Sequence, residues 1–162
     1  MYEFIFNTTD DGKQGKAFEM AVKQALKRRN PNRISPCGYS DFRYKNHCYD
    51  VKQNGTVIKY GDFSDKYIKG SSRVIYATHI ACDVTDNGDG TTTVVVDLDN
   101  TTFFVVDRNE FVEFLISTGK VKVNSSRNTI NIQTCYNYKK NAYHGRLGKI
   151  IEGWCFDNAL DD

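Results

Sequence analysis

The segment 41–52 constrains the fold more than any other part of the chain, because it alternates apolar and charged residues around a polar pair, Lys45-Asn46. Side chains alternate between the two faces of a strand, so this pattern predicts an antiparallel hairpin with a two-residue turn. That register places Asp41 directly opposite Asp50. The predicted core face carries Phe42, Tyr44, Tyr49 and Val51, and the other face carries Asp41, Arg43, Asp50 and Lys52.

A helix is predicted before this hairpin, over residues 14–29. Phe18, Val22 and Leu26 recur at helical spacing, and Asn30-Pro31 should end the helix, because the residue before proline disfavours the α conformation. Glu19 lies at the edge of this apolar stripe. It either extends to solvent or reaches into a polar pocket near the sheet, and the sequence leaves both readings open.

The rest of the chain predicts a single domain, 1–162, of mixed α/β (α+β) class. A chain of 162 residues with 40% hydrophobic and 13% aromatic residues can build one core. A turn is expected at 86–90, and a further hairpin around Asp99-Asn100. The expected strands are 2–7, 40–44, 48–53, 73–80, 92–98, 102–106 and 129–135, and the remaining expected helices are 109–118 and 139–154.

Cysteine usage and charge bear on compartment and partners. The five cysteines form no Cys-x-x-Cys pair, which argues against structural zinc and suits a reducing cytosol. No apolar run is long enough to span a bilayer, and the first residues lack the pattern of a secretory signal. We therefore expect a cytoplasmic protein with no membrane partner. The net charge of +2 neither requires nor excludes a polyanion.

The charged face of the hairpin suggests a metal site. Two carboxylates opposite each other repel, and a divalent cation between Asp41 and Asp50 would reverse that term. Lys52 points to the same side as Asp50 and could act on a water or a phosphate. The alternative is an ordinary hairpin with a polar outer face. A three-residue turn would also offset the two aspartates.

Together these segments resemble the PD-(D/E)XK nuclease superfamily, which has the restriction-endonuclease-like fold. The resemblance rests on Gly15-Lys16-Ala17-Phe18-Glu19, on Ser40-Asp41 and on Asp50-Val51-Lys52, in that order. The chain is most similar to the small phage-borne and Holliday-junction-resolvase-like members. Ser40 stands where proline is common, and Asp50 where glutamate is commoner. The resemblance covers the first half well and the second only in element order; it implies a central mixed sheet flanked by helices, and the strands after Cys82 suggest an extra β-hairpin.

The resemblance implies a metal-dependent nuclease that hydrolyses DNA. Asp41 and Asp50 would bind Mg²⁺ or Mn²⁺ with the Val51 carbonyl. Lys52 would position or deprotonate the attacking water, and Glu19 would hold a second metal or a metal-bound water. Small nucleases of this kind are often homodimers, since cutting two strands needs two sites.

A basic cluster lies at the end of the predicted helix that carries Glu19, with its last member beyond Pro31. It consists of Lys27, Arg28, Arg29 and Arg33. Cations at a helix C-terminus are favourable without any ligand, so the cluster is either structural or follows a DNA backbone. The rival to the enzyme is a non-catalytic DNA- or protein-binding accessory protein of a phage or mobile element on the same fold. A third reading is an RNA-processing nuclease.

Overall fold

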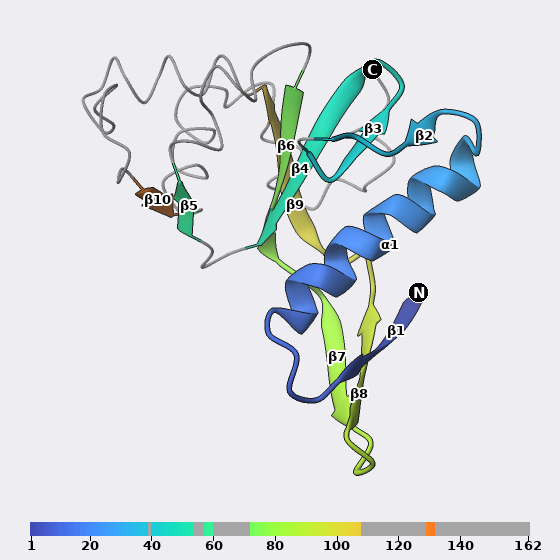
Figure 1. The fold of residues 1–162 in the computed structure, drawn as a ribbon, viewed down its shortest axis with the longest axis vertical. Coiled ribbons are helices and arrows are strands. Elements are labelled where there is room, and N and C mark those ends of the chain that lie inside the picture. The colour runs from blue at the N-terminus through green and yellow to red at the C-terminus, as the bar shows by residue number, and fades with distance from the viewer. Residues whose placement is uncertain (39, 54–56, 60–71, 108–128, 132–162) are drawn as a thin grey trace.

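The computed structural model describes residues 1–38, 40–53, 57–59, 72–107 and 129–131, and Figure 1 shows their arrangement. These residues form a mixed α+β structure, as the sequence predicts. The helix is α1 (Lys13–Arg29), and the strands are β1 (Tyr2–Asn7), β2 (Ile34–Ser35), β3 (Phe42–Tyr44), β4 (His47–Gln53), β5 (Val57–Lys59), β6 (Ser72–His79), β7 (Cys82–Asp86), β8 (Thr91–Val96), β9 (Thr102–Asp107) and β10 (Thr129–Asn131).

The helix α1 packs against two sheets. The larger has the strand order β2-β3-β4-β6-β9, with β4 and β6 parallel and its other neighbours antiparallel. The smaller is antiparallel, with the order β1-β8-β7. In addition, β10 pairs with β5. Figure 1 shows α1 crossing in front of these two sheets, and it contacts β4 and β2 in one and β8 and β1 in the other.

The apolar stripe of α1 forms the centre of the core. The predicted residues Phe18, Val22 and Leu26 are all buried, together with the small Ala17 and Ala21. Each large side chain contributes roughly 1.5–3 kcal/mol through burial, which exceeds intrinsic helix propensity. The helix ends at Asn30 as predicted, and the Asn30 amide donates to the Leu26 carbonyl at 2.8 Å.

The hairpin predicted around Asp99-Asn100 is wrong in its pairing. The two strands exist, but β8 pairs with β1 and β7, whereas β9 pairs with β6 in the other sheet. The connection is a tight corner in which the Asp97 carboxylate accepts the Asp99 and Asn100 amides and the Asp97 carbonyl accepts the Thr101 hydroxyl. A valine-rich alternating segment can pair with any of several neighbouring strands. The sequence therefore predicts that the two strands form but not which strands they pair with.

The hairpin of the smaller sheet instead uses the predicted 86–90 turn, which joins β7 to β8. The Asp86 and Asp89 carboxylates accept backbone amides there, and Gly88 and Gly90 have φ of 77° and 86°. The predicted helices 109–118 and 139–154 lie outside the described residues, as does 132–135 of the last predicted strand. The described helix is too short and too polar to cross a membrane.

Candidate functional site

The hairpin has the predicted register. Phe42 pairs with Tyr49 and Tyr44 with His47, which leaves Lys45 and Asn46 as the turn. Lys45 has a φ of 54°, the sign that primed hairpin turns require at their first central residue.

Aromatic packing stabilises the hairpin itself, and one polar contact ties it to the end of α1. Phe42 and Tyr49 stack with ring centroids 5.4 Å apart, and both rings are buried. The side chain of Asn30, at the end of α1, donates to the buried Tyr44 hydroxyl at 2.8 Å. The hairpin therefore has a defined position against the helix that carries Glu19.

Regular pairing between β3 and β4 covers Phe42–Tyr44, so Asp41 lies one residue outside it. The Asp41 amide donates to the Tyr49 carbonyl at 3.0 Å, although Tyr49 is already the partner of Phe42. In turn, the Val51 amide donates to Asp41 Oδ2 at 2.7 Å. Asp41 and Phe42 are therefore both directed to Tyr49. Such a two-against-one pairing resembles a β-bulge, which changes the direction of a side chain. The predicted strand from residue 40 is thus shorter, and the Asp41 carboxylate bonds to β4.

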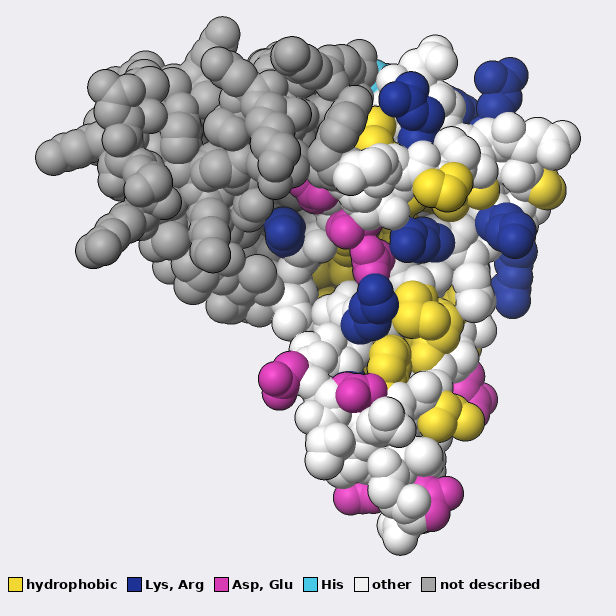
Figure 2. All heavy atoms as spheres, in the orientation of Figure 1, with side chains coloured by type: hydrophobic (Ala, Val, Ile, Leu, Met, Phe, Trp, Pro, Cys, Tyr) yellow, Lys and Arg dark blue, Asp and Glu magenta, His cyan; other side chains and the backbone are white. Residues whose placement is uncertain are grey.

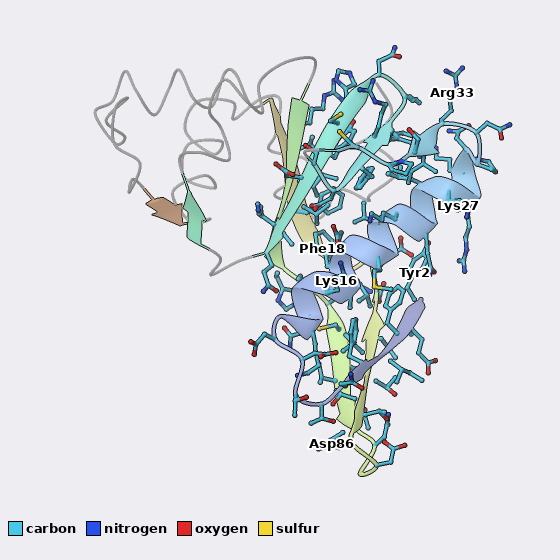
Figure 3. The ribbon with its side chains drawn as sticks, viewed as in Figure 1. Tyr2, Lys16, Phe18, Lys27, Arg33 and Asp86 are labelled. Carbon is cyan, nitrogen blue, oxygen red and sulfur yellow. The ribbon has the colours of Figure 1, made fainter. Side chains whose placement is uncertain are left out.

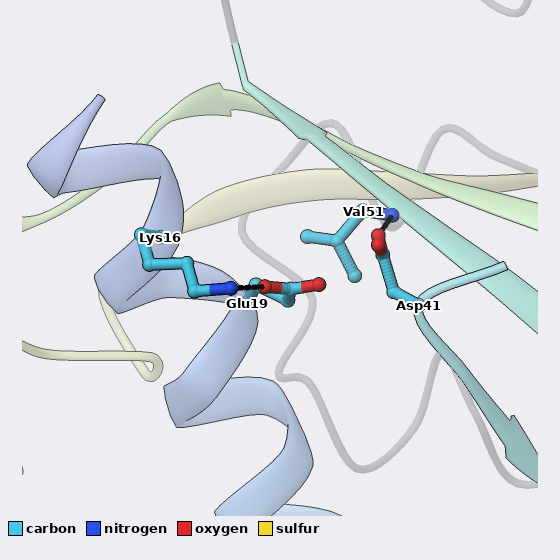
Figure 4. A network of polar contacts seen from close by, with 4 residues as sticks. All are labelled: Lys16, Glu19, Asp41 and Val51. Atoms are coloured by element: carbon cyan, nitrogen blue, oxygen red, sulfur yellow. Dashed lines mark hydrogen bonds and ion pairs between the residues drawn. The ribbon is translucent and has the colours of Figure 1, made fainter. Parts of the chain in front are cut away.

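Glu19 approaches the same point from the helix. Its side chain is only 13% exposed, so the pocket reading of this residue holds and the solvent reading does not. The Glu19 carboxyl lies close enough to that of Asp41 to act on its pKa, and Lys16 Nζ lies 3.3 Å from Glu19 Oε2. Figure 4 shows Glu19 directed from α1 toward Asp41, with Val51 behind it on β4.

This proximity changes the acid strength of Asp41. Burial, the hydrogen bond with Glu19 and the Glu19 charge raise the pKa of Asp41 from 3.8 to about 7, against the lowering effect of the Val51 amide. The charge of Asp50 adds to the rise. Two carboxyl groups so close together cannot both ionise cheaply, so Asp41 keeps its proton to a higher pH than an isolated aspartate does.

A cavity of about 610 Å³ opens at this pair, between the first turns of α1 and the end of β4. Four predicted site residues line it, namely Glu19, Asp41, Val51 and Lys52. Its other lining residues are Phe6, Asp10, Asp11, Gly12, Gly15, Lys16 and Gln53. Figure 2 shows acidic side chains between Lys and Arg side chains on this face of the molecule.

Asp50 occupies a different position from the one predicted. It lies half-buried on β4 and acts on the pKa of Asp41, but it does not line the cavity. Within the described ranges no three His, Cys, Asp or Glu side chains are grouped closely enough to hold a metal ion. Asp41 lies outside the paired residues of β3, so it has no regular cross-strand partner in β4.

Gln53 is a site residue that the alternation rule missed. Neighbouring residues of a strand point to opposite faces, yet Gln53 and Lys52 both line the cavity, which lies around the end of β4. Gly15 permits this approach, because a Cβ there would lie only 3.0 Å from Gln53 Cδ. A glycine in the first turns of a predicted helix, facing the site, was the available signal.

The residues of the predicted basic cluster do not lie together at one site. The Arg28 guanidinium lies 4.9 Å from the centre of the Tyr2 ring, a cation–π contact with β1. Lys27 lines a second hollow beside the hairpin, while Arg29 and Arg33 are exposed. Figure 3 shows Lys27 and Arg33 toward the C-terminal end of α1 and Lys16 toward its start.

Two cysteines meet next to the site, which their spacing did not reveal. Cys37 Sγ lies 2.6 Å from Cys48 Sγ, and both are free thiols. Burial and the contact with Cys37 raise the pKa of the Cys48 thiol to about 11.

Comparison of the chain with protein-family models, with curated proteins and with solved structures finds no match. The case for a function therefore depends on the geometry of these residues.

Proposed function

We propose that this chain is a metal-dependent nuclease that hydrolyses phosphodiester bonds in DNA. The observation that carries the proposal is the meeting of Glu19 from α1 and Asp41 from the hairpin, beside Lys52, in the lining of one cavity. Carboxyl groups are costly to bring together in a folded protein, so their contact requires a reason. A cation site provides one.

The residues present fit a hard divalent cation. The donor set is carboxylate and backbone oxygen, which Mg²⁺ and Mn²⁺ prefer, and Mg²⁺ commonly uses one or two carboxylates with waters. Glu19 and Asp41 would hold the ion with the Val51 carbonyl, and Asp50, which does not line the cavity, would act on the site through its charge. A bound cation would supply a water of lowered pKa and neutralise charge at the phosphate.

The remaining chemistry belongs to the chain's own groups. Lys52, half-buried in the cavity wall, would orient the attacking water or stabilise charge on the phosphate oxygens. Lys16 keeps a positive charge beside Glu19 and would help to admit an anionic substrate. Gln53 can donate or accept hydrogen bonds at the same wall.

The proposal includes the restriction-endonuclease-like fold for 1–162 as one domain. The order of a helix with Glu19, a hairpin with Asp41 and Asp50-Val51-Lys52, and a further strand supports it, as does the mixed larger sheet. With it come a cytoplasmic location, a phage or mobile-element origin and a homodimer that places two sites on a duplex.

The test is a cleavage assay with Mg²⁺ or Mn²⁺ on linear duplex, single strand, flap and four-way junction. Wild-type protein should cut at least one substrate, and chelator should stop it. Lys52→Ala should bind Mn²⁺ in calorimetry as wild type does but lose most turnover, whereas Asp41→Ala should lose Mn²⁺ binding. Lys45→Ala, in the turn of the same hairpin and outside the cavity, is the matched control.

A non-catalytic binding protein on the same fold is the second candidate. The observation in its favour is that Asp50 does not line the cavity, which leaves Glu19 and Asp41 there without the third carboxylate of the predicted site. Protein that binds no divalent metal and cuts none of the four DNA substrates, nor single-stranded RNA, would refute the nuclease. Retained binding of DNA would then support this candidate.

A further inference from the structure

A second hollow, of about 580 Å³, lies on the other side of Asp41 from the candidate site. Asp41 lines both cavities, so the two meet at this residue. The second is bounded by the C-terminal half of α1, by the segment that follows it and by the hairpin. Its lining residues are Lys23, Gln24, Lys27, Pro31, Ile34, Ser35, Pro36, Asp41 and Phe42.

One wall of the hollow is cationic. Lys23 and Lys27 stand four residues apart on α1, so they share one face of the helix about one turn from each other. Like charges at this spacing repel. Among the described residues, no ion pair involves either lysine, whereas Lys16 is paired with Glu19 on the same helix. An anion between the two ammonium groups would remove the repulsion.

The opposite wall is apolar. Pro31 and Pro36 are exposed, Ile34 is half-buried, and the ring of Phe42 is 2% exposed beneath them. A flat apolar group could lie against these side chains. Duplex DNA offers phosphates and sugars to a protein surface and keeps its bases stacked inside, so it would use the lysines but not this wall. An unpaired base would use both.

We propose that this hollow binds an unpaired nucleotide of the substrate strand, next to the bond that is cut at Asp41. This inference rests on the proposed nuclease function and names its substrate class: DNA that is single-stranded at the site. Lys23 and Lys27 hold the phosphates on either side of the nucleotide, and the base lies against Pro31, Ile34 and Pro36. The volume lies within the range of ordinary small-ligand sites.

Binding in chelator tests the hollow without cleavage. Fluorescence anisotropy would compare a labelled oligothymidine with a blunt duplex of the same length at several salt concentrations. The single strand should bind at least tenfold more tightly. Lys23→Gln with Lys27→Gln should weaken it at least tenfold and lower the slope of log K against log salt by about 1.4, which is about 0.7 per lost phosphate contact.

A variant of the apolar wall separates base binding from charge. Ile34→Ser should weaken the single strand severalfold and leave the salt slope unchanged, because it removes no charge. Lys45→Gln, outside the hollow, is the charge control and should retain wild-type binding. Equal affinity for duplex and single strand, or no loss in the double lysine variant, would overturn the inference.

The outcomes also distinguish the two proposals. Cleavage of blunt duplex that is insensitive to the Lys23 and Lys27 changes would retain the nuclease and refute the nucleotide site. Single-strand binding that depends on these lysines, in a protein that cuts nothing, would retain the nucleotide site and refute the nuclease.

The cysteine contact supports a second inference, independent of any activity. Cys37 lies in the segment that leads to Asp41, and Cys48 lies on β4, two residues before Asp50. Their sulfur atoms lie 2.6 Å apart, so the two side chains are in direct contact. Cys37 is half-buried and Cys48 is buried, so an oxidant reaches Cys37 first.

We infer that Cys37 and Cys48 form a reversible disulfide when the protein meets a peroxide. The Cys37 sulfur attacks the peroxide and becomes a sulfenic acid, with release of one water from hydrogen peroxide. The Cys48 sulfur then displaces the hydroxyl group as a second water, and the S–S bond forms. Two thiols lose two electrons and two protons, and one peroxide is reduced. The bond ties the segment before Asp41 to β4.

Thiol titration and peptide mapping test this inference. The folded protein is treated with hydrogen peroxide and then unfolded for thiol titration. The number of free thiols should fall from five to three, and a dithiol should restore it. Trypsin cuts after Arg43 and Lys45, so the two cysteines fall on separate peptides that remain linked until reduction. Cys37→Ser should abolish the linked pair, whereas Cys82→Ser, on β7, should retain it. A different linked pair, or oxidation to sulfinic acid without a link, would overturn the inference.

Discussion

Replacing Asp41 by asparagine should stabilise the metal-free protein at high pH. An acid whose pKa rises from 3.8 to about 7 on folding keeps its proton longer in the native state than in the unfolded state. The native state then binds more protons between these values, so the free energy of unfolding falls as pH rises from about 4 through 7. The carboxamide of the Asp41→Asn variant would carry no charge and could still accept the Val51 amide and donate to Glu19.

The size of the effect follows from the shift. The whole rise corresponds to roughly 4 kcal/mol at about 1.4 kcal/mol per pKa unit. Because Asp41 is only half-buried, solvent screening reduces this contribution, and we expect about 2 kcal/mol above pH 8. For a chain of this size that is about 4–8 °C in melting temperature. At pH 4 the substitution should be nearly neutral, since Asp41 is then protonated in the native state.

The assay is urea or thermal unfolding in chelator, from pH 4 to pH 9, for wild type and Asp41→Asn. Asp83→Asn, exposed on β7, controls for general charge effects. Excess Mg²⁺ should raise the wild-type melting temperature at pH 8 and leave that of Asp41→Asn unchanged, because the cation would relieve the repulsion between the ionised carboxylates. The reasoning fails if wild-type stability rises from pH 5 to pH 8, or if Asp41→Asn is equally destabilising at both.

Three further predictions concern the surroundings of the site. Asp50→Asn in chelator should not lower the melting temperature by more than about two degrees, because it removes repulsion; a larger drop would indicate a structural hydrogen bond. Gly15→Ala should not lower the melting temperature, since Ala favours helix by about 1 kcal/mol and the carboxamide of Gln53 can move away, but it should lower DNA cleavage. Wild-type turnover in this variant would exclude Gln53 from the site. Tyr44→Phe should cost about 1 kcal/mol in urea unfolding, because it leaves the Asn30 amide without its acceptor, and no cost would mean that water replaces the hydroxyl.

The amino-acid sequence by itself determined the elements whose signals are local. The helix over 14–29 and its buried face follow from 3.6-residue periodicity. The hairpin register follows from alternation on both sides of Lys45-Asn46, because a slip of one residue would turn Phe42 and Tyr44 out of the core. The stop at Asn30 follows from the proline after it. In each case the residues that specify the element lie within one or two turns of it.

The sequence predicts which residues line the candidate site but not how they are arranged there. Glu19, Asp41, Val51 and Lys52 come together as expected, since the helix stripe and the hairpin face both had to point toward one junction. The hydrogen bonds of Asp41 could not be predicted, because they depend on the Tyr49 carbonyl and the Val51 amide of the neighbouring strand.

Tertiary structure decided which distant segments became neighbours. Valine-rich β8 could pair with any strand, and it pairs with β1 because β1 precedes the helix that covers both sheets. Cys37 meets Cys48 only because the chain after α1 returns along the hairpin. Long-range pairing depends on which apolar faces can be buried together, and that property belongs to the assembled core rather than to any short stretch of sequence.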